Sequence, residues 1–187
     1  MGLTSDLTLS CSETNRAGVA RIFLSEACNV ASFTADSSSL SFSAVTMDST
    51  ANVWYEYEAE FETKSLNIEG SNESGTPTFT NTLEAKILGL DRAKLQRIQD
   101  FIDARKLVAI FESTNLAGTY KRAFVIGWDN ILGVDAAGKP NVSGAIEGAL
   151  DGDNSLTFSL MAKHAELIRE YRGTIETNAS STVTFGS

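Results

Sequence analysis

The feature that most restricts the fold is a strict two-residue alternation over residues 53–63. The odd positions are mostly apolar or aromatic. The even positions carry Trp54 and then four carboxylates, at Glu56, Glu58, Glu60 and Glu62. Successive side chains of a β-strand point to opposite faces, whereas a helix would mix these two sets. The segment is therefore predicted to be a strand with one apolar face and one acidic face.

The same alternation returns after a polar loop at residues 71–77 that contains Gly75 and Pro77. One face of the returning segment carries apolar side chains, at Phe79, Leu83, Ala85 and Ile87. The other face carries polar side chains, at Thr78, Thr80, Thr82, Glu84 and Lys86. Two alternating segments around a Gly/Pro/Asn loop are typical of a hairpin, so residues 53–88 are predicted to form a long β-hairpin.

One helix is predicted at about residues 91–105. Asp91 is a suitable N-cap, and the residues that follow it are strong helix formers. An apolar stripe at helical spacing is formed by Leu95, Ile98, Phe101 and Ile102. Short strand patterns fill most of the remaining chain, and residues 163–172 fit either a helix or a strand. The expected fold is mainly β (α+β), an antiparallel barrel or sandwich with one flanking helix.

The 187 residues suit a single domain with polar arms at about 1–17 and 174–187. Cys11 and Cys28 have no metal-binding spacing and are expected to be small buried side chains, with a disulfide as the alternative. The chain lacks a leader-like start and an apolar run long enough for a membrane, so a cytoplasmic protein without a membrane partner is expected.

The sequence favours no catalytic or cofactor chemistry. His164 is the only histidine and has no recognisable nucleophile motif near it. No zinc ligand set and no phosphate-binding glycine loop is present, and residues 151–154 fit a turn better than a calcium loop. Four similar glutamates offer no distinct environments for an acid and a base. We therefore expect no enzyme, no cofactor and no metal.

The acidic stripe has two interpretations. It is either the solvated outer face of a sheet or the lining of a pore. Neighbouring carboxylates on one strand face are about 7 Å apart, within the Debye length of about 8 Å, so they repel one another. With a formal net charge of −9, the chain is also unsuited to holding a phosphate backbone.

The order of these segments resembles that of bacteriophage tail tube proteins, which are related to the tubes of type VI secretion and other contractile injection systems. The parts that carry the resemblance are residues 17–26, the hairpin, the helix and the strands that end near Met161. The resemblance implies a virion structural protein, made in the host cytoplasm, whose copies form stacked hexameric rings through which phage DNA passes. It places Glu56, Glu58, Glu60 and Glu62 in the lumen. It places contacts between rings at Lys64, Asn72, Glu73, Gly75 and Pro77.

Two alternatives stay open. Another ring-forming tail or neck protein, such as a tail terminator, would share the assembly without making long tubes. A carbohydrate-binding or adhesin-like β-sandwich would instead present Trp54, Trp128 or tyrosines as a binding platform.

Overall fold

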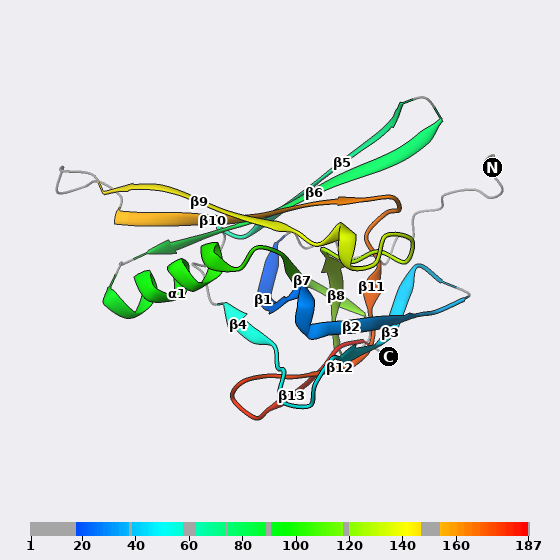
Figure 1. Cartoon of the computed structure of the whole chain (residues 1–187), viewed down its shortest axis with the longest axis horizontal. Helices are drawn as coiled ribbons and strands as arrows, with labels where there is room; N and C mark the ends of the chain where they lie inside the picture. Colours follow the sequence, from blue (N-terminus) through cyan, green and yellow to red (C-terminus); the bar gives the residue numbers. More distant parts are fainter. Residues whose placement is uncertain are drawn as a thin grey trace.

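The computed structural model describes residues 18–37, 39–57, 63–73, 75–88, 91–117, 120–146 and 154–186. These residues form a mainly β structure in which two sheets pack face to face and one helix flanks them (Figure 1). The predicted fold class is therefore confirmed. The predicted N-terminal arm lies outside the described residues.

The larger sheet has seven strands in the order β2-β3-β11-β8-β7-β1-β4. Its strands are β1 (Val19–Glu26), β2 (Val30–Ala35), β3 (Ser41–Met47), β4 (Tyr55–Tyr57), β7 (Leu107–Ala117), β8 (Tyr120–Ile126) and β11 (Glu170–Tyr171). All neighbouring strands are antiparallel except β11 and β3. Short 3-10 turns at Ala27–Asn29 and Val134–Ala136 join some of the elements.

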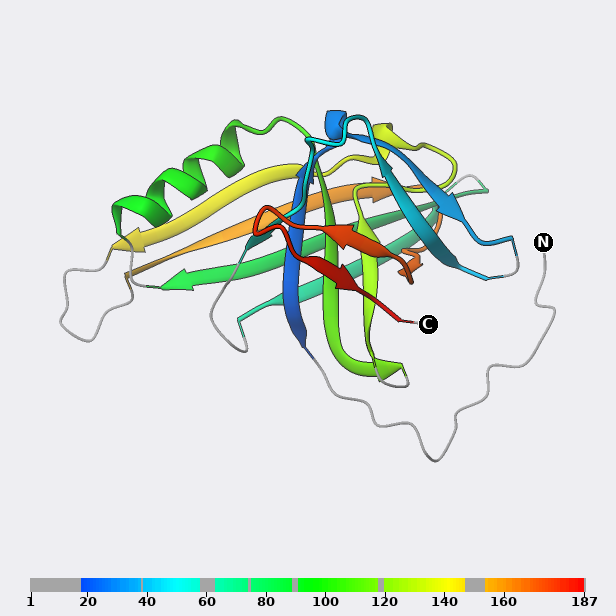
Figure 2. The same cartoon turned by 90° about the horizontal axis from the view of Figure 1, so that it is seen from below.

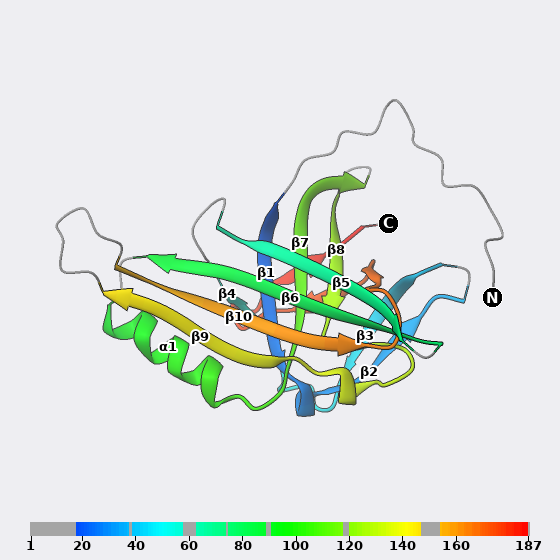
Figure 3. The same cartoon turned by 90° about the horizontal axis from the view of Figure 1, so that it is seen from above.

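The smaller sheet is fully antiparallel, in the order β5-β6-β10-β9. Its strands are β5 (Ser65–Glu73), β6 (Thr76–Leu88), β9 (Lys139–Ile146) and β10 (Asn154–His164). Figure 3 looks onto this sheet, and the strands β1, β7 and β8 behind it run at a steep angle to it. A steep crossing is one of the two common ways in which sheets stack.

The helix α1 (Arg92–Asp103) begins where predicted, because the Asp91 side chain accepts a hydrogen bond of 2.8 Å from the Lys94 N–H. Ile98 and Phe101 are buried against the sheets, whereas Leu95 and Ile102 are 48% and 39% exposed. The predicted apolar stripe is therefore only half covered within one chain.

Two apolar clusters hold the layers together. The first lies between the sheets, where α1 and β4 contribute Phe101 and Tyr57 to aromatic contacts with Phe158. The second lies on the other face of the seven-stranded sheet, around Phe33 and the 1% exposed Trp54. Burial of large side chains on both faces of this sheet is the main stabilising contribution.

The hairpin prediction is confirmed for β5 and β6, which pair from Ser65↔Glu84 to Glu73↔Thr76. Its first part was wrong, because β4 pairs with β1 in the other sheet and is not a continuation of β5. The alternation of residues 53–57 was sound, but alternation does not identify the sheet to which a strand belongs.

Three further expectations need correction. Residues 163–172 are neither a helix nor one strand, because β10 ends at His164 and bends lead into β11. The C-terminal segment packs as the hairpin of β12 (Thr174–Glu176) and β13 (Thr182–Thr184), with Phe185 fully buried. Cys28 is a free, exposed thiol beside Glu26, because the chain turns there; Cys11 lies outside the described residues.

Candidate assembly surface

The four-stranded sheet has two long edges. In the part of the chain that the structure describes, no strand pairs with the outer side of β5 or of β9. Unpaired backbone N–H and C=O groups make such edges a template for pairing with another chain. Because the sheet has an even number of antiparallel strands, β5 and β9 run in opposite directions.

The two faces of this sheet differ sharply. One face packs on the seven-stranded sheet and on α1, through buried residues such as Leu83, Phe158 and Leu160. The opposite face is lined mainly by hydroxyl and amide side chains, among them Asn67, Thr80, Thr82, Asn141, Thr157 and Ser159. Its described charged side chains are Glu69, Glu84, Lys86, Lys139 and Lys163. This polar face is close to neutral and is not an acidic stripe.

Of the four predicted lumen residues, the structure describes Glu56, which does not lie on the four-stranded sheet. Glu56 lies on β4 in the seven-stranded sheet, 3.9 Å from the Arg21 guanidinium. Arg21 is bonded more closely to the nearly buried carboxylate of Glu112, at 2.8 and 3.0 Å. Hydrogen bonding to Glu112 raises the pKa of Arg21. Glu58, Glu60 and Glu62 lie outside the described residues.

The β5–β6 hairpin projects beyond the sheet (Figure 1). Along β6, pairing with β10 begins at Phe79, which faces His164. Before that point β6 pairs only with β5, so residues 70–73 and 75–78 form a two-stranded ribbon. Four of the predicted contact residues lie in this ribbon: Asn72, Glu73, Gly75 and Pro77. Lys64 does not, because it precedes β5 at the opposite end and its Nζ donates to the Ala20 carbonyl at 2.6 Å.

Beside the ribbon, the loops at residues 129–134 and 164–169 are tied together by hydrogen bonds to the buried Asp129 and the partly buried Glu166. Asp129 Oδ2 accepts from Ala165 N–H, and its Oδ1 accepts from Ile131 N–H and Leu132 N–H. Glu166 accepts from Asn130 N–H and forms a bidentate pair with Arg169. Burial alone would raise the pKa of Glu166, but these bonds outweigh burial and lower its pKa.

His164, at the start of the 164–169 loop, is held in place as well. It is 1% exposed, and its Nε2 accepts a hydrogen bond of 3.0 Å from Gly127 N–H. Burial lowers the pKa of His164, so the ring is neutral at pH 7. Its hydrogen bond to Gly127 N–H joins the end of β10 to the residue that follows β8.

The loops at residues 129–134 and 164–169 have apolar side chains that are exposed to solvent. Ile131 is 68% exposed, and Leu132, Val134 and Leu167 are each about 40% exposed. Side-chain hydrogen bonds fix the backbone around these residues. Exposed apolar side chains on a fixed surface are typical of protein contacts.

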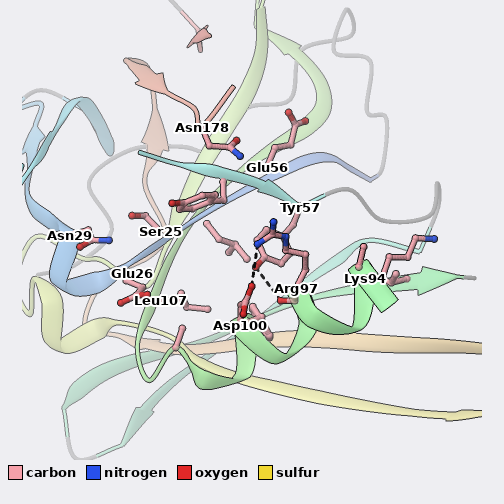
Figure 4. Close-up of a pocket in the computed structure, with 16 residues that line it drawn as sticks. Ser25, Glu26, Asn29, Glu56, Tyr57, Lys94, Arg97, Asp100, Leu107 and Asn178 are labelled. Carbon is pink, nitrogen blue, oxygen red and sulfur yellow. Dashed lines mark hydrogen bonds and ion pairs between the residues drawn. The ribbon is translucent and has the colours of Figure 1, made fainter. Parts of the chain in front are cut away.

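A cavity of about 680 Å³ opens between α1, β1 and β4 (Figure 4). Some of its polar groups bond to one another: Arg97 pairs with Asp100 at 3.2 Å, and Tyr57 Oη donates to the Arg97 carbonyl. Burial raises the pKa of Tyr57. Within the described residues, no cluster of Asp, Glu, His or Cys could hold a metal ion.

Neither tryptophan forms an exposed platform. Trp54 is buried, and Trp128 packs against Phe33. None of the helices in the described ranges is long and apolar enough to cross a membrane.

The polar face was the surface that sequence reasoning missed as a functional candidate. Its signal was present in the run of Thr78, Thr80 and Thr82 opposite the apolar positions. The prediction instead assigned the lumen to the row of glutamates. No protein-family model matches the chain, and neither a curated protein nor a solved structure does.

Proposed function

We propose that this chain is a self-assembling structural protein of the bacteriophage tail-tube type. Its copies join side by side through β5 and β9 into a ring, and rings stack into a tube that conducts DNA. The observation that carries the proposal is the four-stranded antiparallel sheet with two open edges, one buried face and one polar face.

Strand direction supports closure of a ring. β5 and β9 run in opposite directions in one chain, and rotation about an axis roughly along the strands preserves the direction of each. The β5 of one copy therefore meets the β9 of the next as an antiparallel pair. A heterologous contact of this kind closes a ring when the rotation closes, and a closed barrel has no free edges.

The size of such a ring suits a channel. Six copies would give 24 strands, and at ~4.8 Å per strand the backbone diameter would be about 37 Å, or more when the strands tilt. The rest of each subunit lies on the buried face of the sheet, so it must lie outside the barrel (Figure 1). The polar face would then line the channel.

The chemistry of that face suits transit without binding. Hydroxyl and amide groups predominate, and three lysines are offset by two glutamates among its described side chains. Nonspecific retention of DNA depends on clustered positive charge, which this face lacks. In this proposal the lumen is lined by β5, β6, β9 and β10, and Glu56 lies away from it.

The ends of the subunit suit contacts between stacked rings. The ribbon at residues 70–73 and 75–78 and the apolar loop surface around Ile131 lie at the same end of the molecule (Figure 1). A two-stranded ribbon is only marginally stable alone in water, so a partner would stabilise it.

The proposal is tested by the mass of the purified protein in solution, measured over a range of concentrations, and by negative-stain electron microscopy. We expect rings with a central hole, and tubes at higher concentration. A single species with the mass of one chain at every concentration would contradict it. Rings that never stack would favour the alternative of a terminator or neck protein.

A further inference from the structure

The two open edges of the four-stranded sheet carry opposite charges. Among the side chains that the structure describes, the charged one on β9 is Lys139 and the charged one on β5 is Glu69. Lys139 and Glu69 both lie on the polar face, toward the end of the sheet where the ribbon projects. Both are exposed, and within the described residues neither has an ion-pair partner in its own chain.

The other side of the β9 edge is apolar. α1 lies along β9 on the buried-face side of the sheet (Figures 2 and 3). At 100° per residue, Leu95 and Ile102 lie within about 20° of each other on the helix. Neither residue lines the cavity, to which α1 contributes residues such as Arg97 on its other side, and both are exposed. On β5, Ile68 is 39% exposed and points to this same side of the sheet.

We infer that these groups form one junction between neighbouring copies of this chain. Glu69 of one copy faces Lys139 of the next on the polar face, and Ile68 packs toward Ile102, the nearer end of the apolar stripe of α1, on the opposite face. The inference rests on the proposed ring and names the residues that hold it together. It also accounts for the half-covered apolar stripe of α1.

The ion pair selects the register of the two strands. Opposite charges facing each other across a strand pair are stabilising, and like charges are destabilising. Glu69→Lys sets a second lysine against Lys139, and Lys139→Glu sets a second glutamate against Glu69. Each single reversal is expected to weaken the association of two copies about tenfold. Both positions are exposed, so the fold of the chain is retained.

The complementary design restores association in two ways. The double variant E69K/K139E regains the attraction, because the lysine is now on β5 and the glutamate is on β9. An equimolar mixture of E69K and K139E also regains it, because each junction in an alternating ring then joins a lysine to a glutamate. Glu84→Lys is the matched control, since Glu84 lies on the same face of the central strand β6 and away from both edges.

The apolar side of the junction is tested separately. Ile68→Ser and Ile102→Ser should each weaken association several-fold, in proportion to the apolar area that they remove from the contact. Leu40→Ser is the control, because Leu40 is 55% exposed and lies between β2 and β3 of the other sheet, away from β5, β9 and α1.

Sedimentation velocity of all variants decides between the outcomes. Loss of rings in each single reversal and recovery in the mixture and in E69K/K139E would support the junction. If wild type forms rings and the reversals assemble equally well, or if neither combination recovers assembly, the junction is wrong while the ring proposal stands. If wild type never assembles, the ring proposal fails and the junction fails with it.

Discussion

Replacing His164 by glutamine should remove one specific acid sensitivity from the fold. The His164 Nε2 accepts from Gly127 N–H in a site that is 1% exposed, so the folded protein requires the neutral ring. Burial lowers the pKa of His164 from its ordinary value of 6.5, although the nearby carboxylates of Asp129 and Glu166 oppose this shift. A glutamine Oε1 can accept the same hydrogen bond and does not titrate.

Proton uptake by the unfolded chain decides how the free energy of unfolding changes with pH. Well above pH 6.5 His164 is neutral in both the folded and the unfolded chain, so this residue adds little pH dependence there. Below pH 6.5 the unfolded chain binds a proton that the folded chain excludes, and stability falls by up to about 1.4 kcal/mol per pH unit. The loss stops growing when the pH reaches the lowered pKa of the folded state.

Urea unfolding of wild type and H164Q between pH 5.5 and 7.5 measures this contribution. Because the carboxylates titrate in both proteins, the difference between the two free energies of unfolding isolates His164. We expect wild type to lose up to about 1.4 kcal/mol relative to H164Q on going from pH 7.5 to pH 5.5. Parallel profiles would refute the reasoning that a neutral, buried His164 accepts the Gly127 bond.

Three further predictions concern the fold and the proposed channel. Gly127→Ala should cost about 2 kcal/mol or more, because φ is +84° and the new Cβ would lie 2.5 Å from the Leu107 carbonyl oxygen. Gly75→Ala has a similar φ of +80° with open space around it, so thermal denaturation should show the smaller loss there. Phe185→Ala should cost about 3 to 5 kcal/mol, since Phe185 is fully buried against Phe23 and Tyr171; an unchanged melting temperature would show that the C-terminal hairpin is dispensable. Thr82→Lys with Ser159→Lys should make assembled tubes retain DNA at moderate salt in co-sedimentation, whereas Thr46→Lys on β3 should not; equal retention would exclude the polar face as the channel lining.

The fold class was predictable because its signals are local. Alternation between Phe79 and Ile87 identified β6, and the Asp91 cap with the spacing of Ile98 and Phe101 identified α1. Each of these signals depends only on residues a few positions apart, so no knowledge of tertiary packing was needed.

What could not be predicted depends on contacts between distant segments. Tyr57 pairs with Ile22 and Leu66 pairs with Leu83, so a continuous alternating pattern is divided between two sheets. The polar C-terminal segment is anchored by Ile175 and Phe185, which are buried in the second apolar cluster, and Phe185 contacts Phe23 of β1 and Tyr171 of β11. In neither segment does the local pattern show which partner the strand will find.

The candidate site was divided in the same way. The sequence correctly located the ribbon residues Asn72, Gly75 and Pro77 at a hairpin tip. The lumen was assigned to glutamates because four carboxylates follow one another on one face of the predicted strand. Only the strand order shows that β5 and β9 are the free edges of one sheet and that a threonine-rich face lies between them.

In the proposed assembly, the polar face of the four-stranded sheet lines the channel of a ring. The most direct test is cryo-electron microscopy of the assembled particle at a resolution that separates β-strands. We expect a continuous barrel in which β5 of each copy pairs with β9 of the next and Thr82 and Ser159 face the hole. A particle in which this face points outward, or in which these two edges stay unpaired, would contradict it.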